Sequence, residues 1–231
     1  AIEEHHGEWM TPPETFEAVA RAFWNEGFKI HVHCSGDLGV ELALDTLEKL
    51  QWERPRFDHR FTIEHFGVST PEQVRRMAAL GACASVNIYY VHELGDAYWK
   101  NKLGHERASQ MSRLGTLARH NVPTALHTDF TMAPALPLNS AWVAVNRISE
   151  AGHVMGPEEC LTLDQAMRAI TVDAAYVLGL EHEIGTIRAG KKADFTILEQ
   201  DPYEVGGENL REIPIWGTVF EGRPFPIKHK K

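Results

Sequence analysis

Alternating apolar and polar residues mark four short strands in the first two thirds of the chain. Each alternating stretch is bounded by residues that interrupt regular structure, such as the Gly36-Asp37 step after the first one. Short alternating runs with such boundaries are typical of β-strands. The predicted strands cover residues 29–34, 60–65, 82–87 and 122–128.

Apolar residues with helical spacing separate these strands. The first helix has Thr11 as its expected cap and Gly27 as its stop, and another is capped by Thr70 and stops at Gly81. Strands that alternate with helices predict a parallel sheet with right-handed crossovers, so the fold class is α/β. The predicted helices cover residues 12–26, 38–50, 70–80, 107–120, 138–151, 162–170 and 173–178.

Residues 88–106 form a connection that is longer than a structural link requires. The segment contains four large aromatic residues, Tyr89, Tyr90, Tyr98 and Trp99. Long connections of this kind often carry function, so a lid or a substrate wall is one interpretation. The other is a surface loop with an aromatic cluster of its own.

The pattern changes after residue 180. Residues 185–187, 190–198 and 216–222 have the composition of short antiparallel strands joined by tight turns. We therefore divide the chain into a larger α/β domain at 1–180 and a small all-β appendage at 181–231.

Composition argues against several classes of protein. The 231 residues carry a net charge of −9 without a basic stripe, so no nucleic-acid partner is expected. No apolar run approaches the length of a membrane span. Cys34, Cys83 and Cys160 are far apart and form no CxxC motif, which argues against disulfides and a cysteine zinc site. We expect a cytoplasmic protein that acts on a small molecule.

Three candidate metal ligands follow predicted strands: His33, His65 and Asp129. The carboxyl ends of parallel strands meet on a common face, where ligands and metals are usually held. Imidazole and carboxylate bind divalent ions such as zinc, and a metal with an open position lowers the pKa of its bound water to about 7. The alternative is structural, because strand-end histidines are often only hydrogen-bonded and a carboxylate there often caps a helix.

Several motifs resemble the amidohydrolase superfamily, and within it the amidohydrolase-3 group of metal-dependent hydrolases. The most specific is the segment 185–195, which is similar to a C-terminal "G-x-[IL]-x-x-G-x-x-A-D" motif of these enzymes. The others are His33-Cys34-Ser35-Gly36-Asp37, Ile63-Glu64-His65 and Thr128-Asp129, which resemble the segments at barrel strands 5, 6 and 8, and Gly104-His105-Glu106-Arg107, which resembles a segment before the last barrel unit.

The resemblance implies the second half of a TIM-type (β/α)₈ barrel, strands 5–8, plus the C-terminal strands of a small β-sandwich side domain. Members of the group also carry an H-x-H motif on barrel strand 1 and often a bridging lysine on strand 4, and neither precedes Lys29 here. His31-Val32-His33 has the H-x-H spelling but leads into the strand-5 segment, so we interpret His31 as a neighbour. His5 and His6 are alternative substitutes for the absent ligands.

The resemblance also implies a hydrolase that acts on C–N bonds of a small amide, lactam or N-acyl compound. The metal would be zinc or a similar divalent ion, one or two in the complete enzyme, held by His33, His65 and Asp129. Asp129 would act as general base and then as general acid. Arg107 and Asn87 would orient the substrate, with helix capping as the alternative role of Asn87.

Two competing hypotheses remain. In the first, the chain is an inactive amidohydrolase fragment or scaffold. It would self-associate through open sheet edges, since exposed edge strands are normally covered or paired. Alternatively it is a barrel with unrelated chemistry, in which case the match at 185–195 is accidental.

Overall fold

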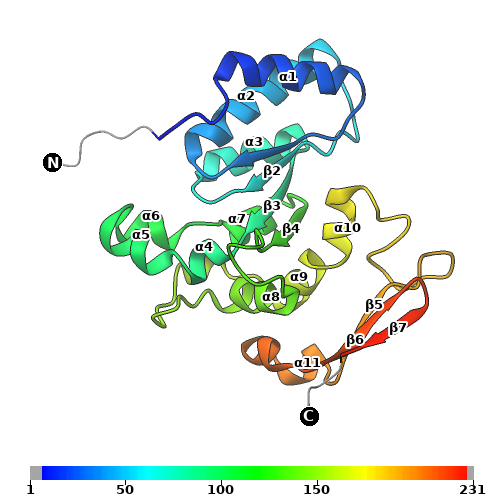
Figure 1. The fold of residues 1–231 in the computed structure, drawn as a ribbon. Helices are drawn as coiled ribbons and strands as arrows, with labels where there is room; N and C mark the ends of the chain where they lie inside the picture. The colour runs from blue at the N-terminus through cyan, green and yellow to red at the C-terminus, as the bar shows by residue number, and fades with distance from the viewer. Residues whose placement is uncertain (1–6, 228–231) are drawn as a thin grey trace.

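A four-stranded parallel sheet forms the centre of the computed structural model, which describes residues 7–227 (Figure 1). The strand order is β1-β2-β3-β4, so each strand pairs with the one before it in the sequence. The four predicted strands and their parallel pairing are confirmed. Their bounds are His31–Cys34 for β1, Thr62–His65 for β2, Cys83–Asn87 for β3 and Thr124–His127 for β4.

The connecting helices bury one face of this sheet. Right-handed crossovers between sequential strands place their helices on the same side, and Figure 1 shows α2 and α3 packed along the sheet. Ile63 and Val86 of the sheet are fully buried in one core with Leu44 and Leu47 of α2 and Met77 of α3. The bounds are Pro13–Asn25 for α1, Asp37–Glu53 for α2 and Pro71–Leu80 for α3.

Two predicted helix ends illustrate how local signals act. The Thr70 side chain accepts from the Gln73 N–H in a capping box, and Gly81 ends α3 with a φ of 71°. The expected cap of α1 is wrong, because Pro12 and not Thr11 occupies the cap position, without a side-chain hydrogen bond. The prolines already fix helical φ values at this end, so a hydroxyl cap is not required.

The segment after β3 differs from the prediction. Residues 88–106 are not one long loop but contain α4 (Tyr89–His92), α5 (Gly95–Asn101) and the start of α6 (Gly104–Ser109). The expected helix 107–120 is interrupted and resumes only as α7 (Leu114–Arg119). The interruption lies at Ser112, which has a φ of 50° and donates its N–H to the Gly67 carbonyl, so a long-range contact overrides the helical pattern.

Short helices complete the α/β unit. The helix predicted at 138–151 ends earlier, because Arg147 leaves the helix with a φ of 48°. Val177 of α10 packs with Cys83 and Ala125, so α10 covers the amino-terminal part of the second sheet face. The bounds are Pro137–Asn146 for α8, Pro157–Glu159 for η1, Leu163–Ala169 for α9 and Val172–Leu178 for α10.

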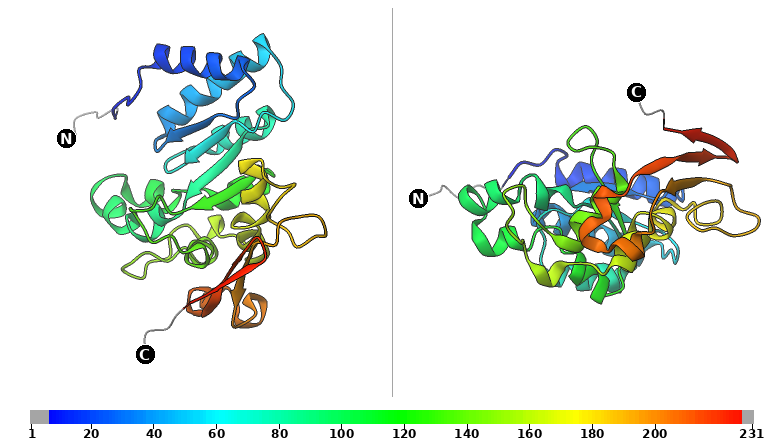
Figure 2. Two further views of the ribbon diagram at one scale, coloured as in Figure 1. Left: turned by 45° about the vertical axis from the view of Figure 1, so that its right-hand side comes forward. Right: turned by 90° about the horizontal axis from the view of Figure 1, so that it is seen from below.

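The C-terminal part is a separate antiparallel sheet of order β5-β6-β7. Figure 2 shows that β6 and β7 extend away from the parallel sheet. Residues 185–187 are not a strand, contrary to the prediction, and Gly185 instead takes a φ of 88° against Ala175. The bounds are Phe195–Leu198 for β5, Pro202–Val205 for α11, Gly207–Glu212 for η2, Ile215–Phe220 for β6 and Arg223–Pro226 for β7, a strand that the pattern did not reveal.

Contacts of η2 with α8 join the two sheets into one structure. The Trp142 indole donates to the Glu208 carbonyl at 2.8 Å, and the Asn146 amide donates to the Gly207 carbonyl at 3.0 Å. The Arg211 guanidinium lies over the Trp142 ring at 3.9 Å. Within residues 7–227 we find no helix with the length and apolar character needed to cross a bilayer.

Candidate metal centre

The face of the parallel sheet opposite α2 and α3 is polar toward the carboxyl ends of the strands. Side chains that are neighbours in register point to the same side of a sheet. His33 is paired with Glu64, Glu64 with Ser85, and Asn87 with His127. Strands of parallel sheets are usually apolar on both faces, because both are covered. A polar face at the carboxyl ends of the strands therefore indicates a functional surface.

Three histidines meet at this edge. The His65 ring lies 4.2 Å from the His33 ring and 4.8 Å from the His127 ring, measured between centroids. The Asp129 Oδ2 atom lies 4.0 Å from His65 Nδ1. Strict alternation would place His65 on the helix-covered face, with Ile63 two positions earlier. Its φ of 68° ends the alternation and brings the imidazole to the other histidines.

The turn after His65 is held in a left-handed conformation. His65 and Phe66 have φ values of 68° and 49°, which cost roughly 1–3 kcal/mol each for non-glycine residues. A Cβ atom at Gly67 would lie 2.8 Å from the Tyr90 ring and 2.9 Å from the Ser35 carbonyl. Only glycine fits under Tyr90, so the turn is tightly packed against the strand end that carries His33.

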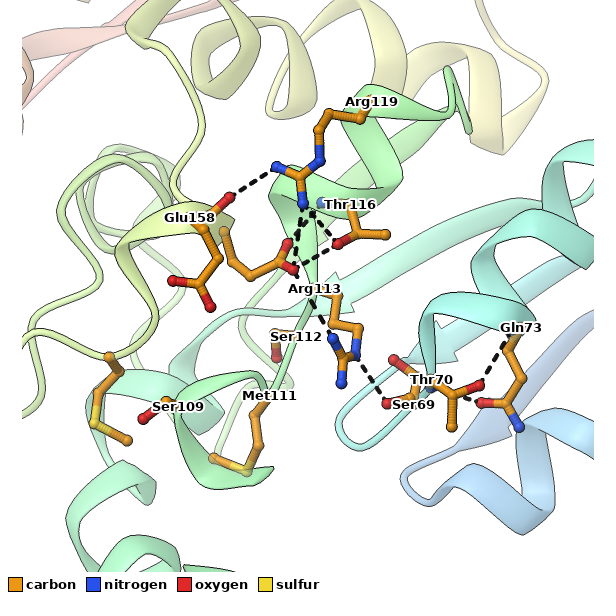
Figure 3. Close-up of polar contacts among 12 residues, drawn as sticks. Ser69, Thr70, Gln73, Ser109, Met111, Ser112, Arg113, Thr116, Arg119 and Glu158 are labelled. Carbon is orange, nitrogen blue, oxygen red and sulfur yellow. Dashed lines mark hydrogen bonds and ion pairs between the residues drawn. The ribbon is translucent and has the colours of Figure 1, made fainter. Parts of the chain in front are cut away.

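A buried polar network holds the segments behind this turn (Figure 3). Arg113 donates to the Ser69 carbonyl at 2.9 Å, which connects the chain before α7 to the loop before α3. Glu159 is buried and accepts from the Thr116 N–H and hydroxyl at 2.6 and 2.5 Å. Arg119 donates to the Thr116 hydroxyl at 2.9 Å. Buried charges are tolerated when they are satisfied in this way, and they make the site's support rigid.

Arg147 is the largest buried charged side chain of this support. It donates four hydrogen bonds of 2.5–3.1 Å to the carbonyls of Ser109, Met111, Ser112 and Met155. Burial lowers its pKa to about 10. These carbonyls surround the Ser112 turn, whose hydroxyl donates to the carbonyl of the last residue of β3. Arg147 therefore fixes a turn that contacts two strand ends of the site.

His65 and His127 are in the form that binds metals. Burial lowers the pKa of His65, and the neighbouring His127 and His33 lower it further. Burial also lowers the pKa of His127, although Glu64 and Asp129 oppose the shift. Both imidazoles are therefore neutral near pH 7, which is the state of a metal-ligating histidine.

One unsatisfied atom tests whether a metal fits. Within residues 7–227, His65 Nδ1 is buried without a hydrogen-bond partner, and it faces the Asp129 carboxylate at 4.0 Å. Two donor atoms on a tetrahedral zinc ion lie roughly 3.3 Å apart, as Zn–N distances of about 2.0–2.1 Å require. A small movement of the exposed Asp129 side chain would bring both atoms onto one ion.

The ligand set is nevertheless incomplete. No three His, Cys, Asp or Glu side chains converge as a ready metal cage within residues 7–227. His33 Nε2 lies 3.3 Å from the Ser35 hydroxyl, which itself lies 3.3 Å from the Tyr90 hydroxyl. The structure places His33 and Asp129 each beside His65, and their role as metal ligands stays a prediction. His5 and His6 lie outside the described residues.

The two predicted substrate residues have other contacts. Arg107 lies on α6 and donates to Asp37 Oδ2 at 2.8 Å on the surface. Asn87 is fully buried, accepts from the Tyr89 N–H at 3.1 Å and donates to Met132 Sδ at 3.1 Å. No contact in residues 7–227 assigns either residue to a substrate, and their roles stay predictions.

The sequence indicated Tyr90 only as part of the 88–106 segment and Glu64 only within the Ile63-Glu64-His65 motif, and it assigned no role to His127. Glu64 accepts from His31 Nδ1 at 2.6 Å. Burial alone would raise the pKa of Glu64, but hydrogen bonds from His31 and Ser85 bring it below its ordinary value. Tyr90 is nearly parallel to the His65 ring at 6.3 Å. His127 stands two residues before Asp129 at the end of a predicted strand, and that position was the available signal.

Comparisons with known proteins show similarity over most of the chain. A family model described as "Amidohydrolase family" matches residues 3–225. The N-substituted formamide deformylase of Arthrobacter pascens is 26% identical over 198 residues, which are 85% of this chain and 36% of that protein. The protein LONG AFTER FAR-RED 3 of Arabidopsis thaliana is 32% identical over 87% of this chain and 34% of its own length. The chain thus spans about a third of these relatives.

Solved structures share the fold. An uncharacterized metal-dependent hydrolase from Pyrococcus horikoshii OT3 has a TM-score of 0.74 at 24% identity, over 89% of this chain and 41% of that chain. One from Pyrococcus furiosus has a TM-score of 0.68 at 26% identity, over 81% and 36%. Atrazine chlorohydrolase TrzN from Arthrobacter aurescens TC1, complexed with zinc, has a TM-score of 0.63 at 19% identity, over 92% and 47%.

Proposed function

Since this chain belongs to the amidohydrolase family, we propose that it carries part of the active site of a metal-dependent hydrolase that cleaves C–N bonds. The substrate class is a small amide, lactam or N-acyl compound. One relative is named as an N-substituted formamide deformylase, and removal of a formyl group from nitrogen is a reaction of this class. The negative net charge and the polar strand ends support a small-molecule substrate and not a nucleic acid.

The observation that carries the proposal is the unpaired His65 Nδ1, which faces Asp129 beside a second histidine. We propose that His33, His65 and Asp129 hold a divalent ion, with zinc as the first choice and one or two ions in the complete enzyme. A bound zinc ion lowers the pKa of its water and polarises a carbonyl. Asp129, whose side chain is 48% exposed, accepts the proton of the attacking water and delivers it to the leaving amine. Arg107 and Asn87 are proposed to orient the substrate.

The fold supports a finer assignment to half of a (β/α)₈ barrel. A barrel needs sequential parallel strands, helices on one face and active-site residues at the carboxyl ends of the strands. The sheet β1-β2-β3-β4 has this order. We propose that it corresponds to barrel strands 5–8, in a domain at 1–180. The antiparallel sheet would belong to a sandwich domain at 181–231.

Whether the remaining metal ligands are supplied decides between a hydrolase and an inactive scaffold. β1 and β4 are the edge strands of the sheet, and the chain spans about a third of its curated relatives. We propose that further polypeptide supplies the remaining ligands, either from the complete enzyme or from a second copy of this chain. The alternative is a catalytically inactive fragment that self-associates through these edges. We also propose that the protein is cytoplasmic and has no membrane partner.

Metal content per chain tests the proposal directly. Protein purified without chelator is analysed by elemental mass spectrometry, together with His33→Ala and Asp129→Asn. His120→Ala is the control, because this histidine is exposed outside the site. Zinc that approaches one ion per chain and is lost in both site variants supports the hydrolase, and an amide and N-substituted formamide screen follows. Metal that is absent, or unaffected by both changes, overturns it.

A further inference from the structure

Glu64 lies between two histidines that the proposed metal site does not use. Its Oε1 atom accepts from His31 Nδ1 at 2.6 Å, and its Oε2 atom faces His127 Nε2 at 3.8 Å. All three residues share the polar face of the parallel sheet, on β1, β2 and β4. Glu64 therefore connects the two edge strands of the sheet across its centre.

One backbone contact indicates which nitrogen of His127 carries the proton. The Asp129 N–H donates to His127 Nδ1 at 3.1 Å, so Nδ1 is an acceptor without a proton. In a neutral imidazole the proton then sits on Nε2. That atom is buried, without a partner at hydrogen-bonding distance, and its polar neighbours are the Glu64 carboxylate and the Ser85 carbonyl. Both neighbours are acceptors, and both favour the same tautomer.

Asp129 depends on this arrangement for its conformation. Its φ of 50° is unfavourable for a residue other than glycine, and the structure must hold it there. Its carbonyl accepts from the Met132 N–H at 2.6 Å, and its N–H is held by the His127 ring. If His127 took the other tautomer, two N–H groups would face each other and the turn would open.

We propose that Glu64 is a positioning residue, which acts through the tautomer of His127 to fix the backbone of Asp129 and thereby the direction of its carboxylate. What Asp129 then does rests on the proposed function, but the positioning itself does not. Outer partners that orient a ligand or a proton carrier are a common feature of metal sites. Here the chain runs from a carboxylate to an imidazole and then to a backbone amide.

Nuclear magnetic resonance of the full ¹⁵N-labelled chain tests the proposal without metal or substrate. We expect His127 to show a protonated Nε2 and an unprotonated Nδ1. In Glu64→Gln, this tautomer preference should weaken, and exchange of the Asp129 amide hydrogen should accelerate about tenfold, the effect of one lost hydrogen bond. The amide of Cys83, which donates to the Phe61 carbonyl in the same sheet, should exchange at the parent rate.

Two further variants separate positioning from folding. In His127→Asn the side-chain oxygen can replace Nδ1 as the acceptor, so the Asp129 amide should stay protected, whereas His127→Leu should lose protection. Glu17→Gln is the matched control, since Glu17 also accepts from two side chains, Arg21 and Lys49, but lies on α1. This control should change neither the His127 tautomer nor the Asp129 amide.

The outcomes are decisive in both directions. An unchanged tautomer and unchanged Asp129 exchange in Glu64→Gln would overturn the proposal. Equal acceleration at Cys83 and Asp129 would also overturn it, because the effect would then be general instability. His33→Ala distinguishes the two proposals, as it should remove metal while it leaves the tautomer intact. Failure of metal binding in the parent chain would therefore count against the hydrolase and not against the role of Glu64.

Discussion

The two ends of strand β2 use buried polar side chains in opposite ways. Before its amino end, His59 is buried with both nitrogens engaged: Nδ1 accepts from the Phe61 N–H at 2.9 Å, and Nε2 donates to the Leu80 carbonyl at 2.9 Å. At its carboxyl end, His65 is also buried, yet its Nδ1 has no hydrogen-bond partner. An unsatisfied buried nitrogen costs roughly 1–3 kcal/mol.

The neighbouring residues repeat this contrast. Arg60 donates to Asp58 and Glu181 and lies 4.1 Å from the centre of the Tyr176 ring, so the amino end is fully paired. At the carboxyl end, the charged Asp129 stays 4.0 Å from His65 and is half exposed. A single strand thus distinguishes residues that stabilise the fold from residues that are kept available for a ligand. Unsatisfied groups are informative because stability alone would not retain them.

Replacement of Arg60 should have the largest effect on stability. Arg60→Met leaves Glu181 and Asp58 without their partner. Loss of one member of a fully buried pair costs about 3–5 kcal/mol, and we expect about 2–3 kcal/mol here because both carboxylates still reach solvent. Urea unfolding followed by circular dichroism measures the change. The control Arg75→Met breaks an exposed pair with Glu72 on α3, which is worth about 0–1 kcal/mol. If both variants lost a similar free energy of unfolding, the ion pairs at the amino end of β2 would be no more stabilising than an exposed surface pair.

The two histidines near the ends of β2 should differ in how much stability their replacement costs. His59→Gln disturbs two satisfied hydrogen bonds and should reduce the free energy of unfolding by about 1–2 kcal/mol. His65→Asn keeps a residue type that tolerates positive φ. It also removes the unsatisfied nitrogen, whose cost offsets the packing lost with the ring, so the free energy of unfolding should fall by less than in His59→Gln.

Zinc titration of the same two variants completes this comparison. His65→Asn should lose zinc affinity, whereas His59→Gln should keep it. Calorimetric titration of the folded proteins measures both affinities. A His65→Asn variant that is strongly destabilised but still binds zinc would show that His65 is a structural residue.

The pH dependence of stability should show the smallest effect. Burial lowers the pKa of His59, His65 and His127 below the ordinary value of 6.5. Between pH 5 and pH 7 the unfolded chain therefore binds more protons than the folded chain, and the free energy of unfolding should rise with pH. The stability is lost as pH falls below 6.5 and is fully present above it. Thermal unfolding at several pH values measures how steeply the free energy of unfolding rises with pH, and His59→Gln should make this rise smaller. A free energy of unfolding that decreases as pH rises would contradict the expected pKa shifts.

Local signals in the sequence were sufficient for some element boundaries. Thr70 and Gly81 act on the backbone within a few residues, and the α3 helix has the predicted ends. The proximity of His33, His65 and Asp129 could be expected because parallel strands bring their carboxyl ends together whatever their exact register. Such features depend on neighbours in sequence or on topology, and both can be inferred from a pattern.

Features that depend on distant contacts could not be inferred. The break at Ser112 follows from a hydrogen bond to the Gly67 carbonyl, and no property of residues 107–120 announces it. The role of Glu64 depends on the register between strands, which places it opposite His33. The rotation of His65 toward the other histidines requires a left-handed residue at a position where alternation predicts the covered face.

The sequential order of the parallel sheet has a consequence for how the chain reaches its structure. His31 pairs with Thr62, Thr62 with Cys83 and Ala84 with Thr124, so every pairing closes a loop of only a few tens of residues. Loop closure costs roughly 0.6 kcal/mol for each doubling of length, and long-range pairing is what slows most β-rich folds. We expect each new strand to add to an edge that its predecessor has just formed, and folding can begin at any adjacent pair.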